Sequence, residues 1–193
     1  MSLGPLATTD VADGKENGAG VTERQVFEKR EGEQELGFDP AGLEGDGRIV
    51  FIGHVRSPWT TREDCPKNMK AARELGLPAT VAIDEPYRCG LAGLERASHV
   101  VILTWLHEAS RNLIVQKPRH AATASGVFAL RSPARPNPIG LHIARLVSAD
   151  IDSGRLALEA IDAIDGTPVV DVKPYFASVD SVPEATVRRV EDI

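Results

Sequence analysis

The stretch "IGLHIARLVSADIDSGRLAL", Ile139 to Leu158, contains two apolar runs joined by a turn. The first run is rich in Ile, Leu and Val and the second in Leu, and Ile and Val are strongly favoured in strands. The sequence Asp152-Ser153-Gly154 separates them, and Gly readily adopts the backbone conformation that a tight turn requires. This stretch is therefore predicted to form a β-hairpin.

Similar short runs, bounded by Gly, Pro, Asp or Ser, continue along most of the chain, as expected for strands. They are "RIVFIGHVRS", "ATVAIDEPY", "HVVILTWLH", "GVFALRS", "GRLALEAIDAI" and "TPVVDVKPY". Short helices are expected at "PKNMKAAREL" and in the last residues from Pro183. Long amphipathic helices do not alternate with the strands, which argues against a doubly wound α/β sheet. We predict an all-β or mainly β fold, a small closed or nearly closed non-Rossmann barrel with one or two short helices.

The N-terminal part of the chain has a different composition. Residues 1–46 are rich in Gly, Asp and Glu and poor in large apolar residues, so they cannot bury enough surface to offset their ordering entropy. One short helix is possible there, because Thr22 and Gln25 have capping-box spacing. We predict a mostly disordered acidic extension over 1–46, a barrel domain over 47–182 and a short tail over 183–193. Residues 1 to about 40 are expected to be dispensable.

The net charge of −6 is unevenly distributed. Residues 1–47 hold 4 basic and 11 acidic side chains, residues 48–145 hold 14 and 7, and residues 146–193 hold 4 and 10. The basic middle segment allows a polyanionic partner, although charges scattered over the surface would explain the same count. Two cysteines are too few for a disulfide framework, and no apolar run could span a bilayer. A cytoplasmic protein is expected.

Several common catalytic motifs are missing. The chain has no G-x-G-x-x-G, G-x-x-x-x-G-K-[ST], G-x-S-x-G or H-E-x-x-H sequence, and its Cys and His residues do not have the spacing of a zinc site. We therefore expect no metal.

The first stretch with a predicted functional role is "RSPARPNPIG", residues 131–140. Its three prolines fix φ and push the preceding residues toward extended geometry. The resulting stiff loop would present Arg131, Arg135 and Asn137 with little loss of entropy, and Gly140 would allow a close backbone approach.

The second such stretch is "DAIDGTPVVDVKPY", residues 162–175. Asp171, Lys173 and Tyr175 alternate along a strand and so share one face. An acid, a base and an aromatic ring on one face are typical of a binding site, and an exposed polar face is the alternative.

These two stretches, together with "GHVRSPW" and "GLERASHVVILTWLHE", resemble the sequence blocks of the TsaA-like tRNA methyltransferases, also called the YaeB or TrmO family. The resemblance runs from about Ile49 to Asp180. It implies an S-adenosylmethionine-dependent enzyme that methylates N6 of the threonylcarbamoyl-modified adenosine at position 37 of tRNA. It also implies a homodimer with the cofactor near the subunit interface.

The resemblance also implies roles for individual residues. The cofactor contacts would fall on Lys67, Asn68, Met69, Lys70, His107, Glu108, Arg131, Leu141, Glu159, Ala160, Ile161 and Asp162. The substrate side would include Arg135, Pro136, Asn137, Asp171, Lys173, Pro174 and Tyr175, of which Asn137, Asp171, Lys173 and Tyr175 are the candidate catalytic residues. Asp162 would favour the cationic sulfonium, Arg131 would bind a carboxylate of the cofactor, and Tyr175 would stack on the base.

This sequence departs from the family pattern at two places. The first cofactor loop reads Pro66-Lys67-Asn68-Met69-Lys70 and leads into a helical run, and Glu108 follows His107 where a glutamine is usual. Glutamate lacks the amide donor of glutamine, so a contact there must differ. A non-catalytic β-barrel that binds S-adenosylmethionine or RNA is the alternative function.

Overall fold

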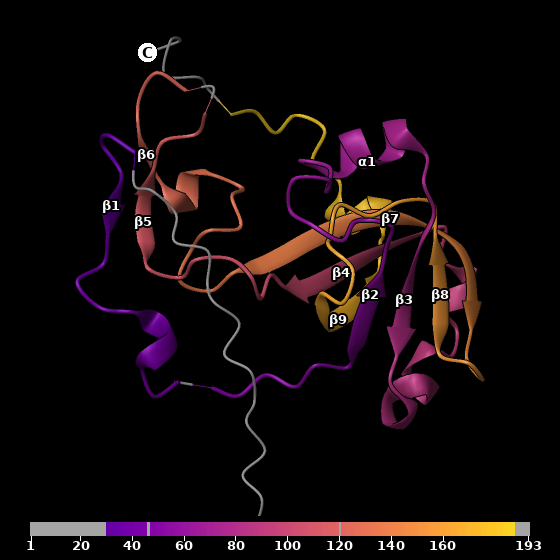
Figure 1. Ribbon diagram of the computed structural model, residues 1–193. Coiled ribbons are helices and arrows are strands. Elements are labelled where there is room, and N and C mark those ends of the chain that lie inside the picture. The colour runs from indigo at the N-terminus through magenta and orange to yellow at the C-terminus, as the bar shows by residue number, and fades with distance from the viewer. Residues whose placement is uncertain (1–29, 46, 120, 188–193) are drawn as a thin grey trace, which may run out of the picture.

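The computed structural model describes residues 30–45, 47–119 and 121–187. Its main body is a closed antiparallel barrel with the strand order β2-β3-β8-β7-β4-β9 (Figure 1). These strands are β2 (Gly53–Arg56), β3 (Ala79–Ile83), β4 (His99–Trp105), β7 (Ile139–Asp150), β8 (Arg155–Leu158) and β9 (Pro168–Pro174). The predicted β-barrel is confirmed.

The hairpin predicted from the first stretch is β7 and β8. Gly154 has φ +71° in the turn between them, and the Asp150 carboxylate accepts hydrogen bonds from the backbone N–H groups of Asp152 and Ser153. The turn therefore combines a left-handed glycine with an aspartate that bonds the backbone just after it.

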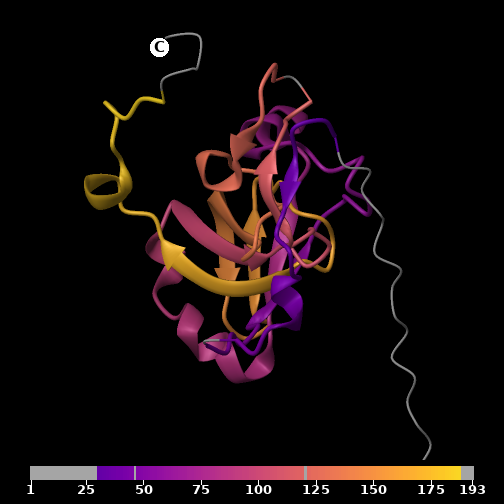
Figure 2. The same cartoon turned by 90° about the vertical axis from the view of Figure 1, so that its left-hand side faces the viewer.

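A second, three-stranded sheet lies beside the barrel (Figures 1 and 2). It has the order β1-β5-β6, formed by β1 (Gln34–Glu35), β5 (Leu113–Gln116) and β6 (Ser125–Gly126). Two of its strands belong to the connection between β4 and β7, so this connection projects from the wall of the barrel that carries the predicted site.

Residues 30–45 differ from the predicted disordered extension. β1 pairs with β5, and a 3₁₀-helix, η1, spans Pro40–Gly42. The Glu33 side chain is buried and accepts hydrogen bonds from the backbone N–H of Arg30 and of Lys117. The carboxylate supplies contacts that composition did not reveal, and this corrects the prediction for residues 30–45. Residues 1–29, including the possible capping box, lie outside the described residues.

The expected first helix is α1 (Met69–Leu75), which Asn68 caps at its N-terminus and Gly76 ends with φ 63°. The connections also contain the 3₁₀-helices η2 (Glu85–Leu91), η3 (Leu94–Arg96) and η4 (Val127–Ala129), and a short helix α2 (Ala177–Asp180). The strand predicted at "GVFALRS" is wrong beyond β6, because η4 follows it directly. Residues 183–187 contain a hydrogen-bonded turn but no helix, and the rest of the segment expected to be helical from Pro183 lies outside the described residues.

The barrel core is aliphatic, and its fully buried side chains include Val55, Val81, Ile102, Leu156 and Ile161. Trp59 is also buried, at 8% exposure, and its Nε1–H donates to the Ile161 carbonyl at 2.9 Å. Within the three described ranges, none of the helices has the length and apolar character needed to cross a bilayer.

Candidate functional site

A chain of three polar side chains lies inside the barrel, where β4 pairs with β7. Thr104 Oγ1 is 2.9 Å from His142 Nε2, and His142 Nδ1 is 2.6 Å from Asp162 Oδ1. Thr104 is completely buried and His142 is 4% exposed. An ionised carboxylate can only accept hydrogen bonds, so Nδ1 carries the hydrogen in the pair with Asp162. The chain thus fixes both the imidazole ring and the carboxylate.

Gly140 makes room for this chain. It lies opposite Thr104 in the β4–β7 ladder. A Cβ at this position would lie 2.3 Å from Thr104 Oγ1 and 2.7 Å from His142 Nε2. The close backbone approach that the sequence predicts at Gly140 is therefore to the hydrogen bond between these two side chains.

The predicted cofactor loop lies against β7. The guanidinium of Arg73, on α1, donates to the Ile143 carbonyl at 2.7 Å, and Met69 packs on the barrel core. The Asn68 side chain accepts a hydrogen bond from the Ala71 N–H at 2.9 Å, so its oxygen begins the helix. Lys67 and Lys70 are exposed, and Lys70 Nζ lies 3.9 Å from a carboxylate oxygen of Glu74.

Cys65 connects this loop with Asp162. Burial, together with the negative charge of Asp162, raises the pKa of the Cys65 thiol to about 11. The thiol therefore stays protonated at neutral pH. The loop before α1 therefore lies close to the carboxylate that His142 holds.

Asp162 is the member of the predicted 159–162 segment whose side chain is best placed to meet a ligand. Ala160 and Ile161 are buried, and the Ile161 carbonyl already accepts from Trp59. The Glu159 N–H donates to the Arg145 carbonyl. The Asp162 side chain remains 17% exposed while its Oδ1 is bound to His142.

The two arginines of the proline-rich loop have different surroundings. Arg131 is exposed, and its Nη2 donates to the Leu141 carbonyl at 3.4 Å, so it joins the loop to the predicted cofactor wall. Arg135 donates to the carbonyls of Ser132 (2.8 Å), Val127 (3.1 Å) and Leu130. The guanidinium that we expected to face RNA is therefore bound to backbone carbonyls of residues 127–132, in η4 and at the start of the loop.

The connection between β4 and β7 is also fixed by Arg111 and by backbone hydrogen bonds. Arg111 lies 5.3 Å from the centroid of the Trp105 ring, and its Nε donates to the Pro136 carbonyl at 2.7 Å. The Leu106 N–H donates to the carbonyl of the fully buried Pro138. The predicted residue Asn137 accepts the Ile139 N–H through its carbonyl. The proline-rich loop is thus fixed by hydrogen bonds as well as by its prolines.

The other predicted residues in this connection are His107 and Glu108. They are exposed, and His107 Nε2 lies 4.0 Å from Glu108 Oε1. Glu108 therefore provides an acceptor beside the imidazole where the family has an amide.

The predicted substrate residues lie on the outer wall of the barrel. Lys173 Nζ is 2.7 Å from Asp171 Oδ2, and both side chains are substantially exposed. In the ladders, Leu103 on β4 lies opposite Leu141 on one side and Asp171 on the other. Asp171 and Leu141 are thus two strand spacings apart, roughly 10 Å. A register shift between Leu103 and Thr104 also places a bulge beside Asp171, and bulges commonly redirect a side chain.

The last two predicted residues follow at the end of β9. Pro174 is exposed and ends the strand. Tyr175 is partly exposed, and its backbone N–H donates to the His99 carbonyl. Tyr175 is therefore held beside the opposite end of β4 from Thr104.

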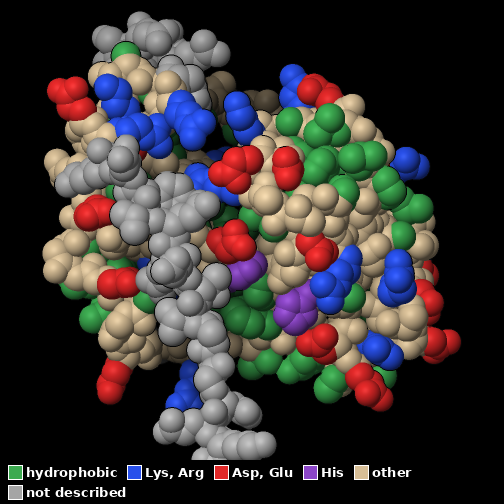
Figure 3. Space-filling view, viewed as in Figure 1, with side chains coloured by type: hydrophobic (Ala, Val, Ile, Leu, Met, Phe, Trp, Pro, Cys, Tyr) green, Lys and Arg blue, Asp and Glu red, His purple; other side chains and the backbone are tan. Residues whose placement is uncertain are grey.

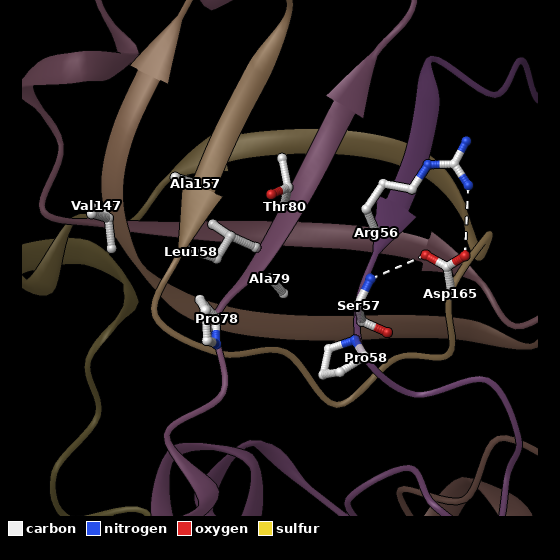
Figure 4. A pocket seen from close by; sticks show the side chains of 10 residues that line it. All are labelled: Arg56, Ser57, Pro58, Pro78, Ala79, Thr80, Val147, Ala157, Leu158 and Asp165. Carbon is white, nitrogen blue, oxygen red and sulfur yellow. Dashed lines mark hydrogen bonds and ion pairs between the residues drawn. The ribbon is translucent and has the colours of Figure 1, made fainter.

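Described residues line at least two hollows on the barrel surface. One, of about 390 Å³, is lined by Arg56, Thr80, Val147, Asp165 and their neighbours (Figure 4), and Arg56 Nη1 lies 3.7 Å from Asp165 Oδ2. No predicted site residue lines it. The other, of about 360 Å³, includes Asp171 and Tyr87. Tyr87 is an aromatic neighbour of the predicted substrate side that the sequence analysis missed.

The structure shows no candidate metal centre in its described residues, where no three His, Cys, Asp or Glu side chains are grouped to hold an ion.

Comparison with known proteins identifies the family. The model for the "tRNA-methyltransferase O N-terminal domain" matches residues 54–181. The chain belongs to this family.

The relatives support this assignment. The chain is 40% identical over 136 residues to a probable S-adenosyl-L-methionine-binding protein of Methanothermobacter thermautotrophicus, covering 70% of this chain and 94% of that protein. It is 47% identical over 94 residues to the mouse tRNA (adenine(37)-N6)-methyltransferase, covering 47% of this chain and 21% of the mouse protein.

The solved structure of TrmO from Pseudomonas aeruginosa matches with a TM-score of 0.59 at 33% identity, over 74% of this chain and 61% of that one. This chain therefore spans less than two thirds of that structure. The predictions of the family and of its barrel fold are confirmed, and the family is one of S-adenosylmethionine-dependent methyltransferases.

His142 and Thr104 are the polar residues of this site that the sequence analysis did not select. A signal was present, because His142 alternates with Gly140, Ala144 and Leu146 on the inward face of a strand. A histidine at an inward position requires a buried partner, but the sequence does not reveal that Asp162 is that partner.

Proposed function

We propose that this protein is an S-adenosylmethionine-dependent methyltransferase that acts on N6 of the threonylcarbamoyl-modified adenosine at position 37 of tRNA. The observation that carries the proposal is the Asp162 carboxylate, fixed by a buried histidine and still partly exposed. It lies beside the loop and strand to which the family resemblance assigns the cofactor.

The residues present fit this cofactor. S-adenosylmethionine supplies a methyl group on a positively charged sulfur. Asp162 provides the negative charge that such a group requires, and Arg131 provides an exposed guanidinium suited to a carboxylate. The names of several relatives as S-adenosyl-L-methionine-binding proteins agree with this assignment.

The charge of the connection between β4 and β7 fits an RNA partner. Residues 106–138 hold five basic side chains and one acidic side chain, and Lys and Arg side chains gather over the second sheet (Figure 3). Lys117 and Arg119 lie in the loop between β5 and β6. Such a surface attracts phosphates regardless of sequence, so it would position the tRNA, while Asp171 on β9 and Tyr175 just after it would act on the base.

A second copy of the chain would complete the site. Ile139 and Leu141 are 44% and 45% exposed on the outer wall of β7, beside Arg131. Apolar side chains exposed at the predicted cofactor wall support a homodimer whose interface borders the cofactor. A tRNA substrate also implies a cytoplasmic location.

The test is methyl transfer from tritiated S-adenosylmethionine to tRNA by the purified protein, followed by nucleoside mass spectrometry. We expect the label in the N6-methyl derivative of threonylcarbamoyladenosine. Asp162→Asn should abolish most of the labelling. Binding of the cofactor and of tRNA without any labelled nucleoside would support the non-catalytic binding module instead.

A further inference from the structure

The buried pair of His142 and Asp162 has a consequence beyond holding the barrel together. We propose that His142 is a positioning residue that directs the Asp162 carboxylate toward the sulfonium and thereby sets the preference for the charged cofactor over its neutral thioether product. This inference rests on the proposed cofactor site, and it concerns which side chains create the discrimination there.

The geometry determines which oxygen is available. His142 Nδ1–H binds Oδ1 of Asp162 at 2.6 Å, and the carboxylate is still 17% exposed. No other described residue bonds this carboxylate. With Oδ1 fixed by a buried ring, the exposed part of the group has one orientation, and this orientation is set without any ligand.

Thr104 fixes the ring itself. An imidazole attached only through Nδ1 could tilt about that contact. The hydroxyl of the fully buried Thr104 binds Nε2 at 2.9 Å, and the absence of a side chain at Gly140 leaves space for this contact. The ring is therefore restrained at both nitrogens, and a pre-oriented carboxylate binds a cation without the cost of ordering it.

Few groups compete for the carboxylate. Cys65 lies close enough to Asp162 for the carboxylate to raise its pKa, and a protonated thiol adds no charge. His142 is the one described basic side chain paired with Asp162. The site therefore attracts a cation before transfer and loses that attraction once the sulfur is neutral, which favours release of the product.

The experiment measures the affinities of S-adenosylmethionine and S-adenosylhomocysteine by calorimetry for the full-length protein. We expect the wild type to prefer the sulfonium by about tenfold, the size of effect that a partly exposed ion pair of 1.4 kcal/mol produces. His142→Asn keeps an amide donor close to the position of Nδ1 and should retain most of this preference. His142→Gln places its amide near the position of Nε2 and should reduce the ratio to about one.

The control is His99→Asn, at the other end of β4, where the ring is hydrogen-bonded to the Ser98 hydroxyl at 3.0 Å. It should leave the ratio of affinities unchanged. A purely structural role would lower the melting temperature of the His142 variants without changing this ratio.

Failure of the inference differs from failure of the proposed function. A wild type that binds neither ligand would remove the cofactor site itself. Equal ratios for wild type and His142→Gln, with binding intact, would overturn the role of His142 alone. If His142→Gln does not fold, nitrogen NMR of the wild type decides: Nδ1 must carry the hydrogen, and an unprotonated Nδ1 would overturn the proposal.

Discussion

Two pairs of acidic and basic side chains involve the strands that flank β4, and the two members of each pair have nearly the same separation. His142 is on β7 and its partner Asp162 is in the connection between β8 and β9, whereas Asp171 and Lys173 are both on β9. His142 and Asp162 are 2.6 Å apart and almost completely enclosed, whereas Asp171 and Lys173 are 2.7 Å apart, with side chains 40% and 62% exposed. Distance alone would rank them as equals. Burial separates them, because water and salt weaken an exposed pair and a buried group left without its partner is costly.

This difference in burial also suits the two pairs to different roles. A buried pair whose groups are fixed by several hydrogen bonds is suited to orienting one ligand group. An exposed pair of flexible side chains can rearrange when a large partner arrives, and its lysine can exchange a carboxylate for a phosphate. The four predictions that follow test this division, beginning with the largest effect.

Breaking the buried pair should cost the most stability. Asp162→Ala leaves His142 buried without its acceptor, and we expect the free energy of unfolding to fall by about 2–3 kcal/mol, somewhat below the cost typical of a fully buried pair. Asp171→Ala is the control on the exposed wall and should cost less than about 1 kcal/mol. Urea denaturation measures both, and equal losses would contradict the distinction between the pairs.

Gly140→Ala should disturb the buried pair of His142 and Asp162 without removing a polar group. The new Cβ would overlap the Thr104 hydroxyl and His142 Nε2, and such overpacking costs about 1–3 kcal/mol. Gly126→Ala is the matched control, because a Cβ there meets nothing within 4 Å and its φ of −59° suits alanine. The melting temperatures of the two variants should differ by several degrees, and an unchanged Gly140→Ala protein would show that the site adapts easily.

The two arginines of the proline-rich loop extend the comparison. Arg135→Ala removes a guanidinium bound to three carbonyls, and charge-assisted hydrogen bonds of this kind contribute about 1.5–3 kcal/mol. We therefore expect a loss of about 2 kcal/mol in unfolding free energy, with little change in the salt dependence of tRNA binding. Arg135→Lys should be nearly as unstable, since lysine cannot reproduce the planar fork.

Arg131→Ala is the paired measurement. Arg131 makes one long contact and is exposed, so its loss should weaken S-adenosylmethionine binding while changing stability by less than about 0.5 kcal/mol. If Arg135→Ala leaves the free energy of unfolding unchanged and reduces the salt dependence of tRNA binding, the original expectation that Arg135 faces RNA is restored.

How far the sequence predicted these outcomes depended on the range of the interactions. The β7–β8 hairpin was predictable because its turn residues and apolar runs are adjacent in the chain. Residues 127–130 were predicted as a strand from their apolar composition, but Val127 and Leu130 form a 3₁₀ turn whose carbonyls bind Arg135. Composition does not reveal which carbonyls a distant guanidinium will reach.

The candidate site shows the same limit. Asp162 was selected from the family resemblance and from its charge, whereas His142 was not, because its role depends on a partner twenty residues away and on Thr104, thirty-eight residues away. Only the barrel register places Thr104 opposite Gly140. Glu33 was missed for a similar reason, since its acceptor role depends on Lys117, eighty-four residues along the chain.

Lys173→Ala should have the smallest effect on stability and a specific effect on RNA. The side chain is 62% exposed, so its removal should change the free energy of unfolding by less than about 1 kcal/mol. If Lys173 neutralises one phosphate, the variant should lower the slope of log K against log salt for tRNA binding by about 0.7–0.9. Filter binding across a salt series measures this slope. Arg155→Ala is the control, because Arg155 is an exposed cation on β8, away from β9, and its removal should leave the slope unchanged. Equal slopes for Lys173→Ala and the wild type would mean that the lysine stays paired with Asp171 in the complex, and the exposed pair would then have the same fixed role as the buried one.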